Sequence, residues 1–229
     1  MCKNLKLIKE VIYVLPFESF IKNRLSEKRF KHSVNVAKAA RWLAFKYEAN
    51  DFKAVIAGIL HDLTKEWKTH DHLMFLQKYN IGVTKYEYGS KKLFHAITAS
   101  IYAKAVLRIT DLDILNAIRF HTTARPEMSK LEKIVYLADF ISDDRSFSGV
   151  DRLRALASIN LDDAVFAGLS DTIKELSDDS KVIHPNTINA YNEFVLIKER
   201  ENSIKSKNDD LAKYISFKPF RESVRVQSF

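Results

Sequence analysis

The sequence predicts an all-α protein, and three observations support this fold class. Only 5 Gly and 4 Pro occur among 229 residues, too few for a turn-rich β fold. Apolar residues recur mostly at three- and four-residue steps, which is the period of an amphipathic helix. Hydrophobic residues make up 46% of the chain and charged residues 29%, close to an ordinary globular protein. We therefore expect long helices around one sizeable core.

The apolar period divides the chain into successive helical segments. Ser129 is expected to cap one helix, with Glu132 three residues on as in a capping box, and Pro185 suits the first turn of another. Glu87–Lys92 is predicted to be a mobile loop. The predicted helices are Asn4–Tyr13, Phe17–Leu25, Lys28–Glu48, Phe52–Thr64, Asp71–Tyr79, Lys91–Arg108, Leu112–His121, Lys130–Ser142, Val150–Ser158, Asp162–Leu176 and Pro185–Lys198.

The character of the chain changes after about residue 194. We expect a main domain over residues 1–194 and a charged C-terminal extension over residues 195–229. Lys198–Lys213 is dense in charge and predicts a helix, whereas Tyr214–Phe229 predicts a tail that packs on the body or on a partner, with disorder as the alternative. Aromatic residues near Phe217 and Phe220 favour a homodimer.

Composition excludes several classes of protein. Cys2 is the only cysteine, so neither an internal disulfide nor a thiolate metal cluster is expected, and a reducing cytoplasm is the expected location. The apolar run Val11–Leu15 is too short for a signal peptide, and no run of about 18 apolar residues predicts a membrane span. The net charge of +8 suits a polyanionic partner. Without a basic cluster or an aromatic RNA-binding motif, a solvated lysine-rich surface is the preferred interpretation over nucleic-acid binding.

Two histidines and two aspartates form the most informative pattern. His61 and Asp62 are adjacent at the end of an apolar helical segment, His32 lies upstream, and Asp139 lies inside an otherwise apolar helix. Imidazole nitrogen and carboxylate oxygen suit borderline and hard divalent cations. Four such ligands leave about two positions of an octahedral ion open for water and a phosphate oxygen.

Each of these residues also has a purely structural interpretation. A single histidine in a helix, such as His32, is usually a hydrogen-bonded and partly buried residue. An arginine or lysine can compensate a buried carboxylate such as Asp139, and His61-Asp62 can act as a helix cap. The four residues taken separately therefore leave metal binding open.

Longer segments around these residues make a family resemblance specific. The order H…HD…D resembles the HD-domain superfamily, and the chain closely resembles its YqeK family of symmetrical diadenosine tetraphosphate hydrolases over roughly residues 17–194. This chain has Ala96 and Ala124 where the family tends to have glycine, and Ser142-Asp143 where it often has Glu-Pro. The matching segments are Arg29–Ser33, Ala57–Lys65, His121–Thr123, Met128–Asp139, Arg145, Gly149–Asp151 and Ile183–Thr187.

The resemblance implies a fold, an activity and a cofactor. The fold would be an HD-domain helical bundle, and the enzyme would cleave the nucleotide polyphosphate substrate diadenosine tetraphosphate symmetrically to two ADP. The metal would be iron, with manganese or another divalent ion as the alternative. The implied metal ligands are His32, His61, Asp62 and Asp139, with Asp62 also a candidate base.

Further residues are expected to bind the polyphosphate. Lys65 would lie one turn beyond His61 if the helix continues, and it is a candidate catalytic residue. Arg145 and Arg125 would neutralise phosphate charge in a bidentate manner. We expect the phosphate also to be contacted by His95, His121 and Thr122, with a second metal at His95 and His121 as the alternative.

Two other functions remain open from the sequence. The same core would serve another HD phosphohydrolase acting on a deoxynucleotide, guanosine tetraphosphate or a cyclic dinucleotide. It would also serve a non-catalytic nucleotide sensor whose C-terminal extension binds a partner. Of the remaining histidines, His70 and His72 are expected at the surface, and His184 is expected to pack or to cap a helix.

Overall fold

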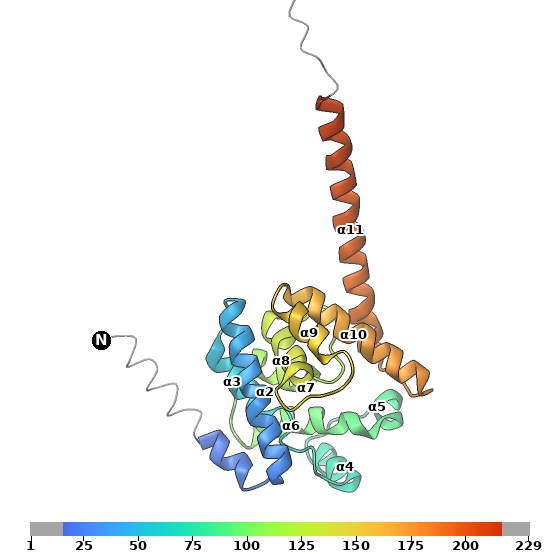
Figure 1. The fold of residues 1–229 in the computed structure, drawn as a ribbon. Coiled ribbons are helices and arrows are strands. Elements are labelled where there is room, and N and C mark those ends of the chain that lie inside the picture. The colour runs from blue at the N-terminus through green and yellow to red at the C-terminus, as the bar shows by residue number, and fades with distance from the viewer. Residues whose placement is uncertain (1–15, 217–229) are drawn as a thin grey trace, which may run out of the picture. The chain divides into compact units, whose positions relative to one another are not determined.

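The computed structural model describes residues 16–216, with side chains described up to residue 207. Every regular element in these residues is a helix (Figure 1), which confirms the predicted all-α class. The chain divides into two units, Met1–Tyr191 and Asn192–Phe229. No described helix has the length and apolar character needed to cross a bilayer.

The first unit holds most of the helices. Residues 16–22 are helical, and α2 (Glu27–Lys46), α3 (Asp51–Leu60), α4 (Thr69–Lys78) and the short α5 (Lys85–Gly89) follow. The 3₁₀ turn η1 (Lys91–Leu93) leads directly into α6 (Phe94–Ala105). The chain continues with α7 (Leu112–Phe120), α8 (Lys130–Ile141), α9 (Val150–Ala157), α10 (Leu161–Asp178) and α11 (Pro185–Ser216).

Polar caps define where several helices begin. The Ser129 hydroxyl accepts a hydrogen bond from the backbone N–H of Glu132, at the helix start predicted from the sequence. Such a cap satisfies one of the four N–H groups that a helix start leaves without a partner. Side chains that cap five other helices in this way are Ser26, Asn50, Thr84, Asp111 and Asn160.

Helix α8 forms the centre of the core. It packs against α2, α3, α7, α9 and α10, and its residues 134–138 are completely buried. Tyr136 is the largest of these side chains. Because Asp139 directly follows this run, packing of α8 carries its carboxylate to the inside of the helical bundle.

A glycine lets α2 and α3 approach closely. A Cβ atom on Gly58 would lie 2.8 Å from the Cα of Ala37, a distance that real side chains do not reach. The absence of a side chain at this position brings the two helices together. The close approach places His32 of α2 beside His61 at the end of α3, with ring centroids 5.3 Å apart.

Some of the predicted elements differ from the structure. The predicted helix Phe52–Thr64 ends earlier, at Leu60. From Leu63 onward, backbone N–H groups donate to carbonyl oxygens three residues earlier, so the chain forms turns and not an α-helix. Glu87–Lys92 is not a loop throughout, because α5 and η1 occupy most of it. Thr84 and Glu87 form a capping box that starts α5, and a five-residue helix is too short to show an apolar period.

Helix α11 continues through the start of the predicted extension. The helix predicted over Pro185–Lys198 and the helical stretch predicted from Lys198 are one element that reaches Ser216. The side chains of residues 201–207 are exposed. The predictions for Asn4–Tyr13, for the tail beyond residue 216 and for a dimer through Phe217 and Phe220 fall outside the described residues.

Candidate metal centre

The His61-Asp62 pair lies where α3 ends. His61 is the C-cap of α3, and its ring atom Nδ1 lies 2.7 Å from the carbonyl oxygen of Gly58. That carbonyl is one of the four that an α-helix leaves without an intrahelical partner at its C-terminus. The imidazole therefore caps its own helix through Nδ1, which leaves its other nitrogen, Nε2, available for another partner.

His95 and His121 are held in the same way. Nδ1 of His121, the C-cap of α7, lies 2.8 Å from the carbonyl oxygen of Ile118. Nδ1 of His95, near the start of α6, lies 2.5 Å from the carbonyl oxygen of Lys92. A carbonyl oxygen only accepts hydrogen bonds, so Nδ1 of each ring carries a proton. In the neutral ring Nε2 then offers a lone pair.

A carboxylate holds the fourth histidine. Nδ1 of His32 lies 2.7 Å from Oδ2 of Asp144, which follows α8. The amide of Asn35 donates a hydrogen bond to the other carboxylate oxygen of Asp144 at 3.3 Å. Burial raises the pKa of Asp144, but the hydrogen bond and charge of His32 outweigh burial and lower it. An ionised carboxylate also only accepts, so His32 donates through Nδ1 and presents Nε2 as a ligand atom.

The four Nε2 atoms surround two carboxylates. Oδ2 of Asp62 lies 3.5 Å from Nε2 of His61 and 3.7 Å from Nε2 of His32. Oδ1 of Asp62 lies 3.0 Å from Nε2 of His95 and 3.7 Å from Nε2 of His121. The two oxygens of Asp62 thus face two different pairs of imidazoles. Oδ1 of Asp139 lies 3.0 Å from Nε2 of His32 and 3.9 Å from Nε2 of His61.

Several of these atoms are buried without a hydrogen-bond partner. They are Nε2 of His32, Nε2 of His61 and Oδ1 of Asp62. A buried polar atom left unpaired costs about 1–3 kcal/mol, and lone pairs that face one another add repulsion. A cation near His32 and His61 would satisfy the two nitrogens, and a cation near His95 and His121 would satisfy Oδ1 of Asp62. Two groups in the described residues have ligand atoms close enough to share an ion: His32, His61 and Asp139, and His61, Asp62 and His121.

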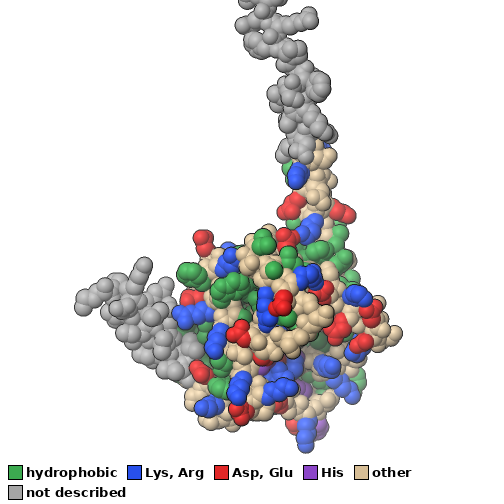
Figure 2. Space-filling view, viewed as in Figure 1, with side chains coloured by type: hydrophobic (Ala, Val, Ile, Leu, Met, Phe, Trp, Pro, Cys, Tyr) green, Lys and Arg blue, Asp and Glu red, His purple; other side chains and the backbone are tan. Residues whose placement is uncertain are grey.

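Basic side chains border the acidic centre. Nη1 of Arg29 lies 2.6 Å from Oδ2 of Asp62, and Arg145 pairs with the carboxylate of Asp139 and donates to its backbone carbonyl. Nζ of Lys65 lies 3.1 Å from Nε2 of His95 and 3.5 Å from Oδ1 of Asp62. Figure 2 shows histidine side chains next to basic ones in the lower central part of this face.

Burial and charge set the protonation of the centre. Burial raises the pKa of Asp62 and of Asp139, but the charge of His61 near both carboxylates and of Arg145 beside Asp139 outweighs burial and holds both pKa values well below the ordinary value. Burial lowers the pKa of His95 to about 4 and also lowers that of His121. Burial also lowers the pKa of His61, but the charges of the two carboxylates outweigh burial, and the pKa of His61 is raised. The ionised carboxylates and the neutral imidazoles of His95 and His121 are therefore in the states that bind metals, whereas His61 has to lose its proton when it binds one.

Comparison with known proteins identifies the family. Residues 29–143 match the model of the HD domain. The chain is 36% identical over 176 residues to the symmetrical bis(5'-nucleosyl)-tetraphosphatase of Halalkalibacterium halodurans, a match that covers 77% of this chain and 94% of that protein. It is 33% identical over 172 residues to the protein of the same name from Bacillus subtilis, with 75% and 92% covered.

The chain belongs to the HD-domain superfamily and, within it, to the family of symmetrical bis(5'-nucleosyl)-tetraphosphatases. A solved structure agrees with this HD-domain fold. The crystal structure of a predicted HD superfamily hydrolase involved in NAD metabolism from Clostridium acetobutylicum matches with a TM-score of 0.76 and 39% identity, over 79% of this chain and 95% of that one.

The HD-domain fold gathers most of the predicted site residues at one place. The four predicted ligands His32, His61, Asp62 and Asp139 lie together, and Lys65, His95, His121 and Arg145 are in contact with them. Lys65 lies in a turn after α3 instead of in the helical continuation expected from the sequence. The hydroxyl oxygen of Thr122, next to His121, is buried without a hydrogen-bond partner.

Arg125 has a different environment. Its guanidinium donates to both carboxylate oxygens of Glu132 at 2.8 and 2.7 Å. Glu132 is buried, so this bidentate pair compensates a buried charge and holds Arg125 against α8. Its predicted contact with the polyphosphate remains a prediction.

Sequence reasoning missed two contacts of this HD-domain centre. Arg29 lies three residues before His32 on α2, a spacing that places both on one helix face, so the sequence did contain a signal for it. Asp144 had no such signal, because the neighbouring Asp143 is equally acidic. Only the path of the connection between α8 and α9 selects Asp144 as the partner of His32.

The three remaining histidines lie outside the centre. His70 is exposed, as predicted, and Nδ1 of His184 accepts a hydrogen bond from the backbone N–H of Asn186 at the start of α11, which confirms the expected cap. The surface prediction for His72 is wrong. Its side chain is buried, with Nδ1 2.9 Å from the hydroxyl of Thr98, because α4 packs against α6.

Proposed function

We propose that the protein hydrolyses diadenosine tetraphosphate symmetrically to two molecules of ADP, using a divalent metal. The observation that carries this proposal is the convergence of four imidazole Nε2 atoms on two ionised carboxylates. The names of the relatives from Halalkalibacterium halodurans and Bacillus subtilis supply the substrate class. In a symmetrical cleavage, the oxygen of water bonds to one of the two central phosphorus atoms. The bridging oxygen then leaves with the other ADP.

The side chains of the centre fit a metal of this kind. We assign the ion to His32, His61, Asp62 and Asp139, and the unpaired buried Nε2 atoms of His32 and His61 support this assignment. When bound, such an ion acts as a Lewis acid toward a phosphate oxygen and lowers the pKa of a water. Iron is the proposed metal, and manganese suits the same nitrogen and oxygen ligands.

A second cation at His95 and His121 is part of the proposal. Each ring donates through Nδ1 to a carbonyl, so a neutral ring has no N–H left to give a phosphate oxygen. Their lowered pKa values favour this neutral state. The Nε2 atoms lie 3.1 Å apart and face Oδ1 of Asp62. This arrangement favours cation binding over the direct phosphate contact expected from the sequence.

The remaining polar side chains suit a polyphosphate. Arg145 is fixed by Asp139 on one side and has a side chain that is 37% exposed, so it can still donate to a phosphate oxygen. Lys65 supplies a positive charge beside Asp62, and Thr122 has an unused hydroxyl. The low pKa of Asp62 makes it a weak base at neutral pH, so we assign it as a ligand and not as the proton acceptor.

A substrate panel tests the proposal against related activities. The metal-loaded protein would be assayed with diadenosine tetraphosphate, a deoxynucleoside triphosphate, guanosine tetraphosphate and a cyclic dinucleotide. We expect kcat/KM to be highest for diadenosine tetraphosphate by at least about tenfold, which is about 1.4 kcal/mol of transition-state binding. A higher value for any other member of the panel would replace the proposed substrate.

Substitution of the central carboxylate separates an enzyme from a nucleotide sensor. Asp62→Ala removes a ligand to both proposed ions, so turnover is expected to vanish. A wild-type protein that binds the dinucleotide but turns over no member of the panel with iron or manganese would favour the sensor.

The number of ions is read from the metal content per chain. We expect two ions in the wild type and one in His121→Ala, whereas one ion in both proteins would refute the second ion.

A further inference from the structure

A cavity next to the proposed centre has no assigned role. It has a volume of about 660 Å³ and begins at Asp139 and Arg145, which both line it. From there it extends between the connection that precedes α9 and the outer part of α10. Cavities of a few hundred Å³ are the usual size for small-molecule sites. A molecule with a phosphate at Arg145 would therefore place its next chemical group here.

The charge of the cavity argues against a second phosphate site. Four carboxylates from α10 and its end line the outer part, against the cations of Arg152 and Lys174. Lys174 pairs with Asp178 of its own helix at 2.6 Å, and Arg152 pairs with Asp171 of α10. An uncharged group with hydroxyls suits such a lining, because carboxylates accept hydrogen bonds from ribose hydroxyls. The four carboxylates are Asp171, Glu175, Asp178 and Asp179.

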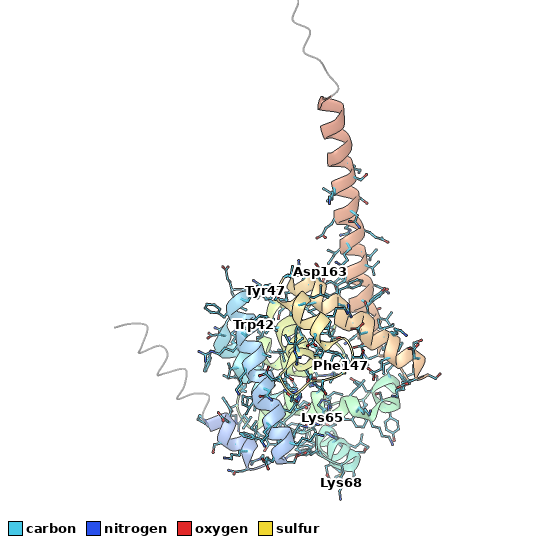
Figure 3. All side chains as sticks on the ribbon, in the orientation of Figure 1. Trp42, Tyr47, Lys65, Lys68, Phe147 and Asp163 are labelled. Atoms are coloured by element: carbon cyan, nitrogen blue, oxygen red, sulfur yellow. The ribbon has the colours of Figure 1, made fainter. Side chains whose placement is uncertain are left out.

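Two aromatic rings line the cavity. Phe140 belongs to α8, and Phe147 lies on the connection between α8 and α9 (Figure 3). Their centroids are 6.4 Å apart with the rings edge to face. Phe147 is 40% exposed, so part of its ring is accessible to a ligand in the cavity. An exposed ring face offers a stacking surface for a planar base.

We infer that this cavity binds one nucleoside of the substrate, with the base stacked on Phe147 and the ribose toward the carboxylates of α10. The inference rests on the proposed function, because it takes the polyphosphate of that substrate as bound at Arg145. A nucleoside bound in this cavity gives the centre a preference for nucleotides over free polyphosphate. The ADP product would use the same cavity.

Binding of two ligands to the metal-loaded protein tests this inference. ADP carries a nucleoside and inorganic pyrophosphate does not, so isothermal titration of both ligands separates the cavity from the centre. For Phe147→Ala we expect the Kd of ADP to rise about tenfold, the typical loss of one stacking contact. The Kd of pyrophosphate should stay within about twofold. Phe147→Tyr retains a ring and should bind ADP as the wild type does.

Phe45→Ala is the matched control, because Phe45 of α2 is 84% exposed and does not line this cavity. Equal ADP affinity in Phe147→Ala and Phe45→Ala would overturn the inference. An equal loss of ADP and pyrophosphate affinity in Phe147→Ala would also overturn it, because the effect would then lie at the phosphates. Wild-type protein that binds ADP through Phe147 without hydrolysing diadenosine tetraphosphate would refute the proposed function alone.

Discussion

Asp144 shows how a single residue outside the proposed ligand set controls the centre. Its carboxylate accepts a hydrogen bond from Nδ1 of His32, which fixes the ring and leaves Nε2 as the ligand atom. Partners of this kind are typically worth a factor of about 10–100 in metal affinity. Asp144→Ala is therefore expected to weaken manganese binding by that factor in a competition titration with a chelating dye.

The neighbouring carboxylate gives this prediction its control. Asp143 is exposed, and the carboxylate at Nδ1 of His32 is that of Asp144, so Asp143→Ala should bind manganese as tightly as the wild type. Asp144→Asn keeps an acceptor oxygen for His32 and should lose less affinity than Asp144→Ala. Equal affinities in Asp143→Ala and Asp144→Ala would show that His32 needs no such partner.

The tautomers of the histidines also depend on single contacts that the sequence does not reveal. The pattern of His61, His95 and His121 predicted residues of one site, and the structure brings them together. It did not predict that each ring donates to the carbonyl three residues before it. That contact depends on a rotamer and on where a helix ends, and neither quantity is encoded in residue spacing.

At the scale of helices, the close contact of α2 and α3 depends on Gly58. In Gly58→Ala the new Cβ would lie 2.8 Å from the Cα of Ala37, so one helix has to move. Overpacking of this kind typically costs about 1–3 kcal/mol, and it would also separate His32 from His61. We expect urea denaturation to show this loss, together with weaker metal binding.

Gly82→Ala is the control for the helix contact. A Cβ on Gly82 would meet no atom within 4 Å, so its free energy of unfolding should change by less than about 0.5 kcal/mol. A Gly58→Ala variant as stable as Gly82→Ala would mean that the two helices adjust freely. The role assigned to the glycine would then be wrong.

Arg154 of α9 holds the connection that carries Asp144 and Arg145. Its guanidinium donates to the backbone carbonyls of Ile141, Ser142 and Arg145 at 3.0–3.1 Å. A lysine cannot reproduce this planar set of donors. Arg154→Lys is expected to increase amide hydrogen exchange in residues 142–149 and to lower kcat about tenfold.

Arg41→Lys serves as the comparison for Arg154. Arg41 is more than half exposed and pairs with Asp51 at 3.6 Å, a contact that contributes little. Its exchange pattern and kcat should match those of the wild type. Unchanged exchange of residues 142–149 in Arg154→Lys would show that the connection holds its path without the arginine.

The helices show which parts of a fold an apolar period can predict. The starts of α7, α8 and α11 were predicted at the residues where they occur, because long amphipathic segments with polar caps have clear signals. The end of α3 at Leu60 was not predicted, because the residues after Leu60 remain compatible with a helix. The end of this helix is set by the fold and not by local propensity, because the chain turns there and brings Asp62 and Lys65 to the centre.

For the whole molecule, an ion pair away from the centre makes stability depend on pH. Oε1 of the buried Glu87 lies 2.6 Å from Nη2 of Arg119. Burial raises the pKa of Glu87, but hydrogen bonds from Thr84 and the charge of Arg119 outweigh it and lower the pKa below its ordinary value of 4.5. The pair therefore stabilises the fold above pH 4.5, and this stability is lost as the pH falls through the lowered value.

Glu87→Gln makes this pH dependence measurable. At pH 7 we expect the variant to be less stable than the wild type by about 1–3 kcal/mol, because a charged hydrogen bond is lost. Urea denaturation from pH 5 to pH 3 should show the difference shrinking as Glu87 of the wild type becomes protonated. A difference that stays constant over this range would contradict the assignment.

The products formed from diadenosine tetraphosphate test the central claim most directly. The iron-loaded protein would be incubated with the dinucleotide and the products separated by anion-exchange chromatography, with Asp139→Ala as the control that lacks one proposed ligand. The account predicts ADP as the only product and no product from Asp139→Ala. AMP together with ATP, or equal turnover by the variant, would contradict it.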